Sequence, residues 1–338
     1  MNHNQTTNDK QQTTNHKQQT ANFHNPMIPH NGNWRSRVCC LSFVISWSFA
    51  SCASPQPAPP DVRTRIPLKE FTIQSHRGAG RMAPENTLAA FEKGWELGTV
   101  PECDMRTTSD GVIVTMHDAT PKRTAPSAPP AVQDRKIEEM TLAEVKALDV
   151  GTAASGVLRV PRIEELFGAL KARPGRRMYF DFKFVSLEHL AALAREHQVE
   201  DRMILATPNP DNVREWKRRC PASRTLLWMG GTEAELEAKL AAIRPDGFAG
   251  TDQLQIHVRL TPEGTPDPFT PSSDFLRRTA RELAGRGVLM QCLIYGEHRA
   301  EHYGKLLDLG VASFATDEPV MTRDAVRAWY GRAAGPGR

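Results

Sequence analysis

Three carboxylate residues lie where they could hold a divalent cation. Glu102 and Asp104 are two residues apart in a run with strand character, so both side chains leave one face while Cys103 points the other way. Asp181 comes near the end of the apolar run 178–183. A polar strand end would explain the first pair alone. Three acids on neighbouring strands repel one another, however, and favour a site for Ca²⁺ or Mg²⁺ that relieves the repulsion.

Four cationic or titratable residues could supply the rest of the chemistry. His76 and Arg77 follow the first strand-like run, and His117 ends another. A guanidinium matches phosphate oxygens, and an imidazole exchanges protons near neutral pH. Lys183 could orient the phosphate or a metal ligand, or could form a structural ion pair with Asp181. Together these residues are the inventory of metal-assisted phosphodiester cleavage, with His76 and His117 dividing the acid and base roles.

The order of strand-like and helix-like runs predicts the elements that position these residues. Short apolar runs alternate with helical patterns, which indicates a parallel sheet with crossover helices. Eight strands in about 270 residues fit an α/β fold, the (β/α)8 TIM barrel. The expected strands are residues 71–75, 100–104, 178–183, 203–207, 225–229, 247–250, 288–294 and 313–316. The expected helices are residues 87–97, 162–172, 186–196, 212–219, 233–243, 273–285 and 302–309.

One further apolar run, residues 112–117, does not belong to the barrel. It follows Asp104 too closely to be a parallel partner, which needs a crossover of about a dozen residues. The Asp-Gly turn at residues 108–111 indicates a hairpin instead. This hairpin would return His117 to the C-terminal mouth of the barrel. Residues 118 to about 160 are then a small insertion over the mouth, with a helix at 142–148.

The motifs around these residues resemble the glycerophosphodiester phosphodiesterase family, within the PLC-like phosphodiesterase superfamily. The resemblance covers residues 70 to about 330 and is most specific in its first half. It implies a barrel with an inserted cap, dependence on a divalent metal, and hydrolysis of glycerophosphodiesters to sn-glycerol 3-phosphate and an alcohol. The matching motifs are His76-Arg77-Gly78, Pro84-Glu85-Asn86-Thr87, Glu102-x-Asp104, Thr108-Ser109-Asp110-Gly111, His117-Asp118, the segment 140–151, Asp181-x-Lys183 and Thr316-Asp317-Glu318-Pro319.

Two departures from the family pattern concern the metal and the substrate. Asp181 stands where the family usually has a glutamate ligand, so the metal distances or the metal itself can differ. The strand 289–294 lacks the tryptophan that the family often places against glycerol. Gln253, Gln255 and His257 alternate along another segment, and we interpret them as a solvated strand edge rather than as lining of the pocket.

The N-terminal region has the pattern of an exported protein. Residues 1–34 form a polar tract rich in Asn and Gln, expected to be disordered. Two arginines, an apolar run at 38–50 and small residues up to 53 then follow the order of an export signal. The segment 49–52 resembles a bacterial lipoprotein box, which would make Cys52 a lipidated membrane tether; cleavage after Ala53 is the alternative. We therefore expect a cell-envelope or periplasmic protein, either lipid-anchored or secreted.

The remaining boundaries follow from composition. The proline-rich segment 54–67 is expected to be a stiff tether, residues 68–330 the barrel, and residues 331–338 a flexible tail. Residues 1–52 hold four of the 43 basic and one of the 39 acidic side chains, so the rest of the chain is almost neutral. A neutral body offers no field for a phosphate backbone, which argues against nucleic-acid binding. Nothing in the pattern indicates an oligomeric state.

Three other functions fit parts of the pattern. The segment 78–83 matches the glycine motif of a dinucleotide-binding fold, but Pro84 would break the helix that this motif must open. A phospholipase D-like or phosphoinositide-cleaving activity on phospholipids or lysophospholipids would keep the barrel and move the scissile bond. A non-catalytic envelope binding lipoprotein would keep the fold, although retention of both histidines, the arginine and all three acids argues against it.

Overall fold

The computed structural model describes residues 61–296 and 298–332 of the chain. The chain divides into two compact units, residues 1–55 and 56–338, and every described residue belongs to the second. The expected polar tract, the export signal with Cys52 and the first half of the tether lie outside the described residues, as does the tail after Arg332.

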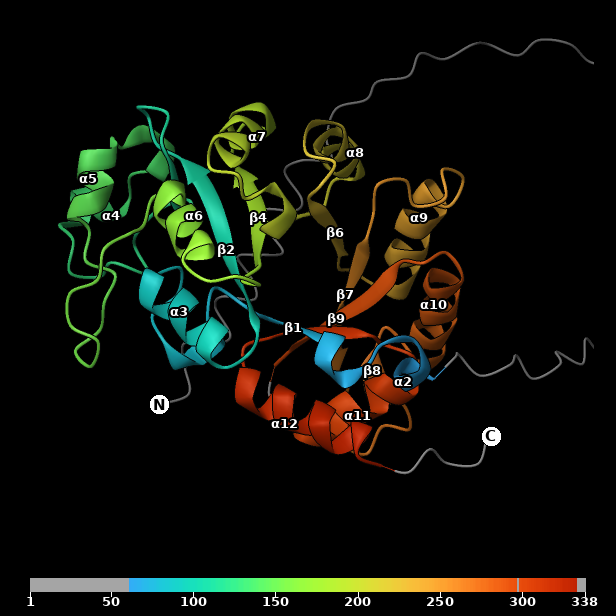
Figure 1. The fold of residues 1–338 in the computed structure, drawn as a ribbon. Coiled ribbons are helices and arrows are strands. Elements are labelled where there is room, and N and C mark those ends of the chain that lie inside the picture. Colours follow the sequence, from blue (N-terminus) through green and yellow to red (C-terminus); the bar gives the residue numbers. More distant parts are fainter. Residues whose placement is uncertain (1–60, 297, 333–338) are drawn as a thin grey trace, which may run out of the picture. The chain divides into compact units, whose positions relative to one another are not determined.

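Eight parallel strands close into a barrel. The first strand, β1, pairs in parallel with both β2 and the last strand, β10, so the sheet of barrel strands has no free edge. This confirms the predicted (β/α)8 fold, and Figure 1 shows the helices arranged outside the strands. The barrel strands are β1 Thr72–Ser75, β2 Val100–Thr107, β4 Met178–Phe184, β5 Met203–Thr207, β6 Arg224–Met229, β7 Gln253–Leu260, β9 Leu289–Tyr295 and β10 Ser313–Thr316.

A helix follows each barrel strand. Several begin at side chains that satisfy the free N–H groups of the first turn, such as Thr87 before α3 and Thr232 before α9. Their apolar stripes pack against the outward-facing strand residues in two large clusters. The helices are α3 Leu88–Glu96, α6 Ile163–Lys171, α7 Leu187–Glu196, α8 Pro210–Arg219, α9 Glu233–Ile243, α10 Ser273–Gly285, α11 Ala300–Asp308 and α12 Pro319–Tyr330.

The predicted strand at residues 247–250 is wrong, because this segment is a turn. Gly247, Phe248 and Gly250 all have positive φ angles, of 67°, 62° and 77°, which no regular strand adopts. The sixth barrel strand is β7, Gln253–Leu260, which pairs in parallel with β6 and β9. The residues interpreted as a solvated edge therefore belong to the barrel wall.

The hairpin forms as expected. The end of β2 pairs antiparallel with β3, Ile113–Thr115. The insertion that follows contains α4, Pro130–Gln133, and α5, Leu142–Ala147. Its apolar side chains pack with Val114 and Met116 in a small cluster of their own. Figure 1 shows α4 and α5 next to α6 and the end of β2, so the insertion borders the barrel on one side. A second short strand, β8 Phe269–Thr270, pairs antiparallel with β7.

The last residues of the expected tether are folded. Residues Val62–Arg65 form the short helix α2, which begins at Asp61. The guanidinium of Arg63 lies 4.6 Å from the ring centroid of Trp329, and the Tyr330 hydroxyl donates to the carbonyl of Ile66. The chain therefore packs on α12 before it enters β1. Among the described residues, no helix is long and apolar enough to cross a membrane.

Candidate active site

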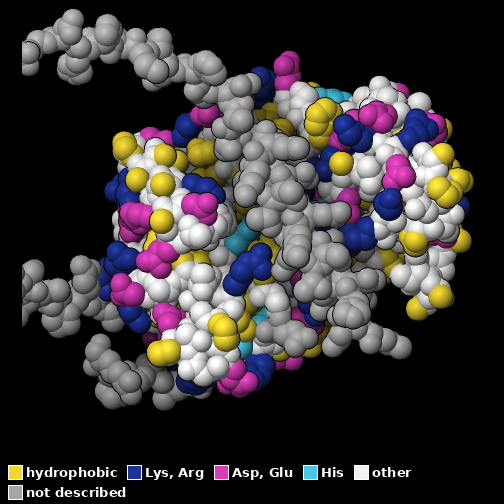
Figure 2. Space-filling view, turned by 180° about the vertical axis from the view of Figure 1, so that it is seen from behind, with side chains coloured by type: hydrophobic (Ala, Val, Ile, Leu, Met, Phe, Trp, Pro, Cys, Tyr) yellow, Lys and Arg dark blue, Asp and Glu magenta, His cyan; other side chains and the backbone are white. Residues whose placement is uncertain are grey.

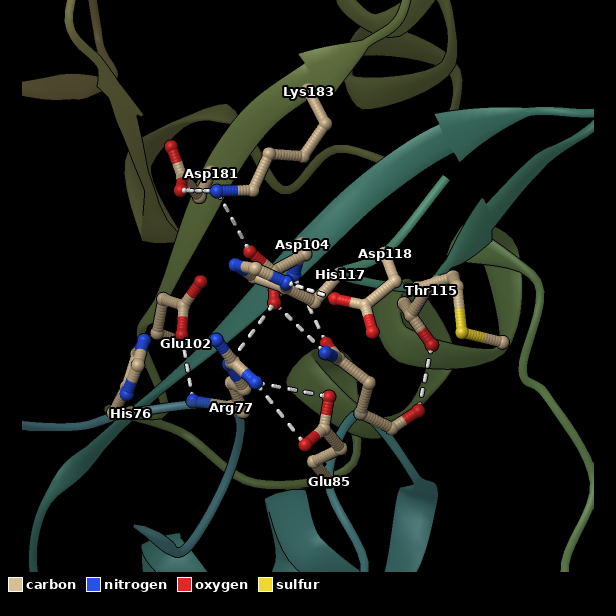
Figure 3. Close-up of polar contacts among 12 residues, drawn as sticks. His76, Arg77, Glu85, Glu102, Asp104, Thr115, His117, Asp118, Asp181 and Lys183 are labelled. Carbon is tan, nitrogen blue, oxygen red and sulfur yellow. Dashed lines mark hydrogen bonds and ion pairs between the residues drawn. The ribbon is translucent and has the colours of Figure 1, made fainter. Parts of the chain in front are cut away.

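The seven predicted site residues lie together at the C-terminal ends of the barrel strands. Figure 3 shows all of them in one cluster, contributed by β2, β4, the loop after β1 and the segment after β3. Figure 2 shows histidine side chains beside Lys and Arg side chains near the centre of one face of the molecule. Strands far apart in the sequence thus bring these groups to one mouth. The residues are His76, Arg77, Glu102, Asp104, His117, Asp181 and Lys183.

The three acids form a buried group that suits a hard cation. Asp104 and Asp181 are direct partners in the pairing of β2 with β4, and Glu102 precedes Asp104 on the same face. One oxygen from each carboxylate lies within 4.8 Å of the others, and none of the three residues is more than 9% exposed. Burial, together with the charge of Asp104, raises the pKa of Glu102 to about 8. The site therefore accommodates three negative charges poorly without a compensating cation.

Lys183 already contributes one positive charge to this group. Its Nζ atom lies 2.6 Å from Oδ2 of Asp181 and 3.2 Å from Oδ1 of Asp104. Burial opposes its charge, but the two carboxylates outweigh burial and raise the pKa of Lys183. Burial alone would raise the pKa of Asp104, but the positive charges of Lys183, His117 and Arg77 keep this pKa below its usual range. The ion pair foreseen between Lys183 and Asp181 is present, and it extends to Asp104.

His76 is oriented by a carboxylate from the segment that follows the last barrel strand. Its Nδ1 atom lies 2.8 Å from Oδ1 of Asp317, and because a carboxylate only accepts, Nδ1 carries the proton. Burial alone would lower the pKa of His76, but the charge of Asp317 outweighs it and raises that pKa. The imidazolium form of His76 is therefore favoured.

His117 has a similar partner but the opposite electrostatic environment. Its Nδ1 atom lies 2.6 Å from Oδ1 of Asp118, which leaves Nε2 as an acceptor in the neutral ring. Burial lowers the pKa of His117, and Lys183 and Arg77 add to the effect. The two imidazoles of the site thus differ in the protonation state that their surroundings favour.

Arg77 lies in a turn that aims both its backbone and its side chain at the acids. Its φ of 52° is in the left-handed region, and its N–H donates to Oε2 of Glu102 at 2.6 Å. Nη1 donates to both oxygens of Glu85 at 3.2 Å. Nε is buried without a hydrogen-bond partner, 4.0 Å from Oδ2 of Asp104. The Nε side of this guanidinium therefore faces the Asp104 carboxylate without donating a hydrogen bond to it.

Asn86 holds in place the side chain of Asp104, the most buried of the three acids. Its Nδ2 donates to Oδ2 of Asp104 at 2.8 Å, and its Oδ1 accepts from the Asp104 N–H at 2.9 Å. Its own carbonyl accepts from the Thr115 hydroxyl. Through its side chain and its backbone carbonyl, Asn86 thus ties the loop after β1 to both strands of the hairpin.

An aromatic wall borders the acids on β6, β7 and β9. The indole Nε1 of Trp228 donates to Oδ1 of Asp181 at 3.0 Å. The ring of His257 stacks on Trp228 at 5.3 Å and meets the edge of Tyr295 at 5.2 Å. Burial lowers the pKa of His257 to about 3, so this ring is neutral. The interpretation of Gln255 and His257 as a solvated edge is therefore wrong, because both face the barrel interior and hydrogen-bond each other.

Several residues of this site were not assigned a role from sequence. Asp317, Glu85 and Asp118 lie within quoted motifs, but their pairing with His76, Arg77 and His117 depends on tertiary contacts. Trp228 carried no local signal. Its position next to the last residue of an apolar strand gives an inward-facing side chain at the mouth only once the barrel register is known.

Comparison with known proteins gives a consistent result. The model of the glycerophosphoryl diester phosphodiesterase family matches residues 76–321. A glycerophosphodiester phosphodiesterase of Caldanaerobacter subterraneus is 29% identical over 167 residues, which cover 46% of this chain and 64% of that relative. The aligned segment thus spans less than two thirds of the relative's length.

Solved structures agree with the fold. The glycerophosphodiester phosphodiesterase of Agrobacterium tumefaciens superimposes with a TM-score of 0.57 at 22% identity, covering 76% of this chain and 99% of that one. A phosphodiesterase of Oleispira antarctica, solved with the product sn-glycerol 3-phosphate, gives a TM-score of 0.57 at 20% identity, covering 79% and 99% of the two chains. At these identities the likeness concerns the fold.

Proposed function

The chain belongs to the glycerophosphoryl diester phosphodiesterase family, and on that premise we propose that it hydrolyses glycerophosphodiesters to sn-glycerol 3-phosphate and an alcohol. One observation carries the proposal. Two imidazoles, each held by its own carboxylate, flank a guanidinium and a group of three acids at a single barrel mouth. The product found in the Oleispira antarctica neighbour supports the same substrate class.

The phosphate would be bound by the cationic side chains of the site. The guanidinium of Arg77 lies beside the acid group, where a phosphate oxygen would accept a hydrogen bond from it. Lys183 adds a second positive charge on the opposite side of Asp104. These fixed charges would stabilise the negative charge on the phosphoryl oxygens in the transition state.

The two histidines would divide the proton transfers. His117, neutral and with a free Nε2, would accept the proton of the substrate's own glycerol hydroxyl as that hydroxyl attacks phosphorus and expels the alcohol. Water would then open the resulting cyclic phosphate to give sn-glycerol 3-phosphate. His76, favoured as the imidazolium, would donate a proton to the oxygen of the leaving alcohol. Each transfer typically contributes about 10²- to 10⁴-fold to the rate. The opposite electrostatic environments of the two rings support this division of roles.

The donor set of the acid group fits a divalent cation. Glu102, Asp104 and Asp181 offer hard carboxylate oxygens within reach of one ion, and the raised pKa of Glu102 reflects the repulsion that such an ion would relieve. Bound Ca²⁺ or Mg²⁺ would supply Lewis-acid neutralisation of the phosphate charge. The shorter Asp181, in place of the family glutamate, is already engaged by Trp228 and Lys183, which orient it for this role.

Product analysis tests the proposal. The purified protein is incubated with glycerophosphocholine or lysophosphatidylcholine, with and without EDTA, and the products are identified. We expect sn-glycerol 3-phosphate and choline from the first substrate, and no reaction with EDTA. Release of lysophosphatidic acid alone, or no turnover of either substrate, would contradict the proposal. Family membership favours it over phospholipase D-like cleavage, phosphoinositide cleavage and a non-catalytic binding role.

Export to the cell envelope remains part of the proposal. It is supported by the arginine, apolar and small-residue pattern of residues 35–53. Lipidation at Cys52 would tether the barrel to a membrane, within reach of the glycerophosphodiesters that phospholipid breakdown releases.

A further inference from the structure

The guanidinium of Arg123, in the insertion, donates hydrogen bonds to two acids, Glu85 and Asp118. Glu85 contacts the phosphate-binding Arg77, and Asp118 contacts the proposed base, His117. Arg123 Nη1 and Nη2 donate to the two oxygens of Glu85 at 2.6 and 2.7 Å. Its Nε donates to Oδ2 of Asp118 at 2.7 Å. Glu85 also accepts from Arg77, and Asp118 accepts from His117. A continuous chain of charge-assisted hydrogen bonds therefore joins the proposed base to the phosphate-binding guanidinium.

We propose that Arg123 is a positioning residue, which holds Glu85 and Asp118 at a fixed separation so that Arg77 and His117 address the same phosphate. This assignment rests on the proposed function and extends it, because it gives the insertion a part in catalysis. Arg123 lies between β3 and α4, in the first turn of the insertion. It contacts neither metal ligands nor reacting atoms in the described contacts, and acts through two other residues.

The geometry requires an arginine. Three different nitrogens of one planar group engage two carboxylates, and the pair with Glu85 is bidentate. A lysine ammonium is a single point charge on a flexible stem and cannot fix the separation of two carboxylates in the same way. Charge alone would therefore not replace the guanidinium.

The same insertion offers a matched comparison. Arg135 Nη1 pairs with Oε1 of Glu144 at 2.6 Å, and its side chain is 37% exposed, against 32% for Arg123. Neither Arg135 nor Glu144 contacts a site residue in the described interactions. Exposed ion pairs of this kind contribute little to stability. Any difference between the two arginine variants in turnover thus reports on the link to Glu85 and Asp118.

The test compares Arg123→Ala, Arg123→Gln and Arg123→Lys with Arg135→Ala. For each protein, kcat and KM for glycerophosphocholine are measured together with the thermal unfolding midpoint. Because a misplacement of about 1 Å can cost about 10²-fold in rate, we expect all three Arg123 variants to lose about 10- to 100-fold in kcat. Their unfolding midpoints and that of Arg135→Ala should stay close to wild type, as should the kcat of Arg135→Ala.

Chemical rescue separates positioning from general stabilisation. Because the Arg123 side chain is 32% exposed, free guanidinium at millimolar concentration can reach the space that Arg123→Ala leaves. We expect guanidinium, but not ammonium, to restore several-fold of the lost kcat. Wild-type rates in Arg123→Lys, or a loss that guanidinium leaves unchanged in a folded variant, would overturn the assignment. A wild-type protein without activity would instead overturn the proposed function itself.

Discussion

The Nδ1 atom of His76 lies 2.8 Å from Oδ1 of Asp317, although the two residues are 241 positions apart in the sequence. His76 follows the first barrel strand and Asp317 follows the last, and the parallel pairing of β1 with β10 brings them together. Closure of the barrel is therefore what sets the protonation of a proposed catalytic side chain.

The pH dependence of turnover should report on this pair. A general acid must be protonated, so the alkaline limb of the kcat profile follows the pKa of His76, which Asp317 raises above 6.5. In Asp317→Asn the carboxylate is lost, the pKa falls, and the alkaline limb should move to lower pH with reduced kcat. Asp324→Asn, which alters an exposed acid on the following helix, α12, is the control. An unmoved alkaline limb in Asp317→Asn would exclude His76 as the acid.

His117, the proposed base, should control the acid limb of the pH–rate profile, and its removal should lower the rate. His117→Ala should lower kcat by about 10²- to 10⁴-fold, the usual contribution of a general base. In the wild type the acid limb should lie below pH 6.5, because burial lowers the pKa of His117 and a base must be unprotonated. Steady-state rates across pH measure both effects, with the exposed His189→Ala as control. Near-normal turnover of His117→Ala would show that the assignment is wrong.

The barrel was predictable because its signals are local. Seven of the eight barrel strands overlap short runs expected from the sequence, and the shared face of the acids at 102 and 104 follows from the alternation of side chains along a strand. The hairpin was predictable from the short spacing between Asp104 and the next apolar run. A hairpin reverses the direction of the chain, so its second strand had to bring His117 back to the mouth of the barrel.

The sixth strand was missed because the barrel interior is polar here. In β7, Leu254, Ile256 and Val258 face the helices, while Gln253 and Gln255 face inward. The inward amides are satisfied by a chain of hydrogen bonds to Tyr179, Gln291 and His257. Alternation of polar and apolar residues normally indicates one solvated face. Only the closed sheet shows that this polar face is buried.

The metal site should couple cation binding to proton release. Without a metal, Glu102 has a pKa of about 8, raised by burial and by Asp104, so it is mostly protonated at neutral pH. A ligand carboxylate must lose this proton on binding Ca²⁺ or Mg²⁺. Calorimetric titration at pH 7 in buffers of different ionisation enthalpy should therefore show proton release. The release should vanish in Glu102→Gln; equal heats in all buffers for the wild type would contradict the prediction.

The same carboxyl group should make stabilisation by metal depend on pH. Between its ordinary value of 4.5 and about 8, folded Glu102 keeps a proton that the unfolded chain has lost. Its contribution to stability therefore falls as pH rises through this window. The increase in unfolding midpoint on adding Ca²⁺ or Mg²⁺ should be larger at pH 8.5 than at pH 6. An increase independent of pH would place the cation away from Glu102.

Lipid attachment can be tested in a bacterial host that modifies lipoproteins. If Cys52 is the modified residue, cells fed labelled palmitate should label the wild-type protein and not Cys52→Ser. The wild type should then fractionate with membranes and the variant with the soluble envelope fraction. N-terminal sequencing that begins at Ser54 in the wild type would instead favour simple secretion after cleavage at Ala53.

The loop that carries His76 depends on a glycine at position 80. Gly80 has a φ of 59°, and a Cβ atom there would lie 2.1 Å from the carbonyl oxygen of Asp317. That carbonyl also accepts from the N–H of Arg81 at 3.0 Å. A side chain at position 80 must therefore push the loop after β1 away from the end of β10, where His76 meets Asp317.

Gly80→Ala should consequently lose both stability and the acid function. Gly98 is the control, because its φ of 76° imposes the same backbone strain but a Cβ atom there would meet nothing within 4 Å. Both variants should lose about 1–2 kcal/mol in the free energy of unfolding from the left-handed conformation. Only Gly80→Ala should lose more free energy of unfolding than this. Its alkaline limb of the kcat profile should also move to lower pH, as in Asp317→Asn. If Gly80→Ala behaves like Gly98→Ala in both measurements, the close approach of the loop after β1 to the segment after β10 does not control the pKa of His76.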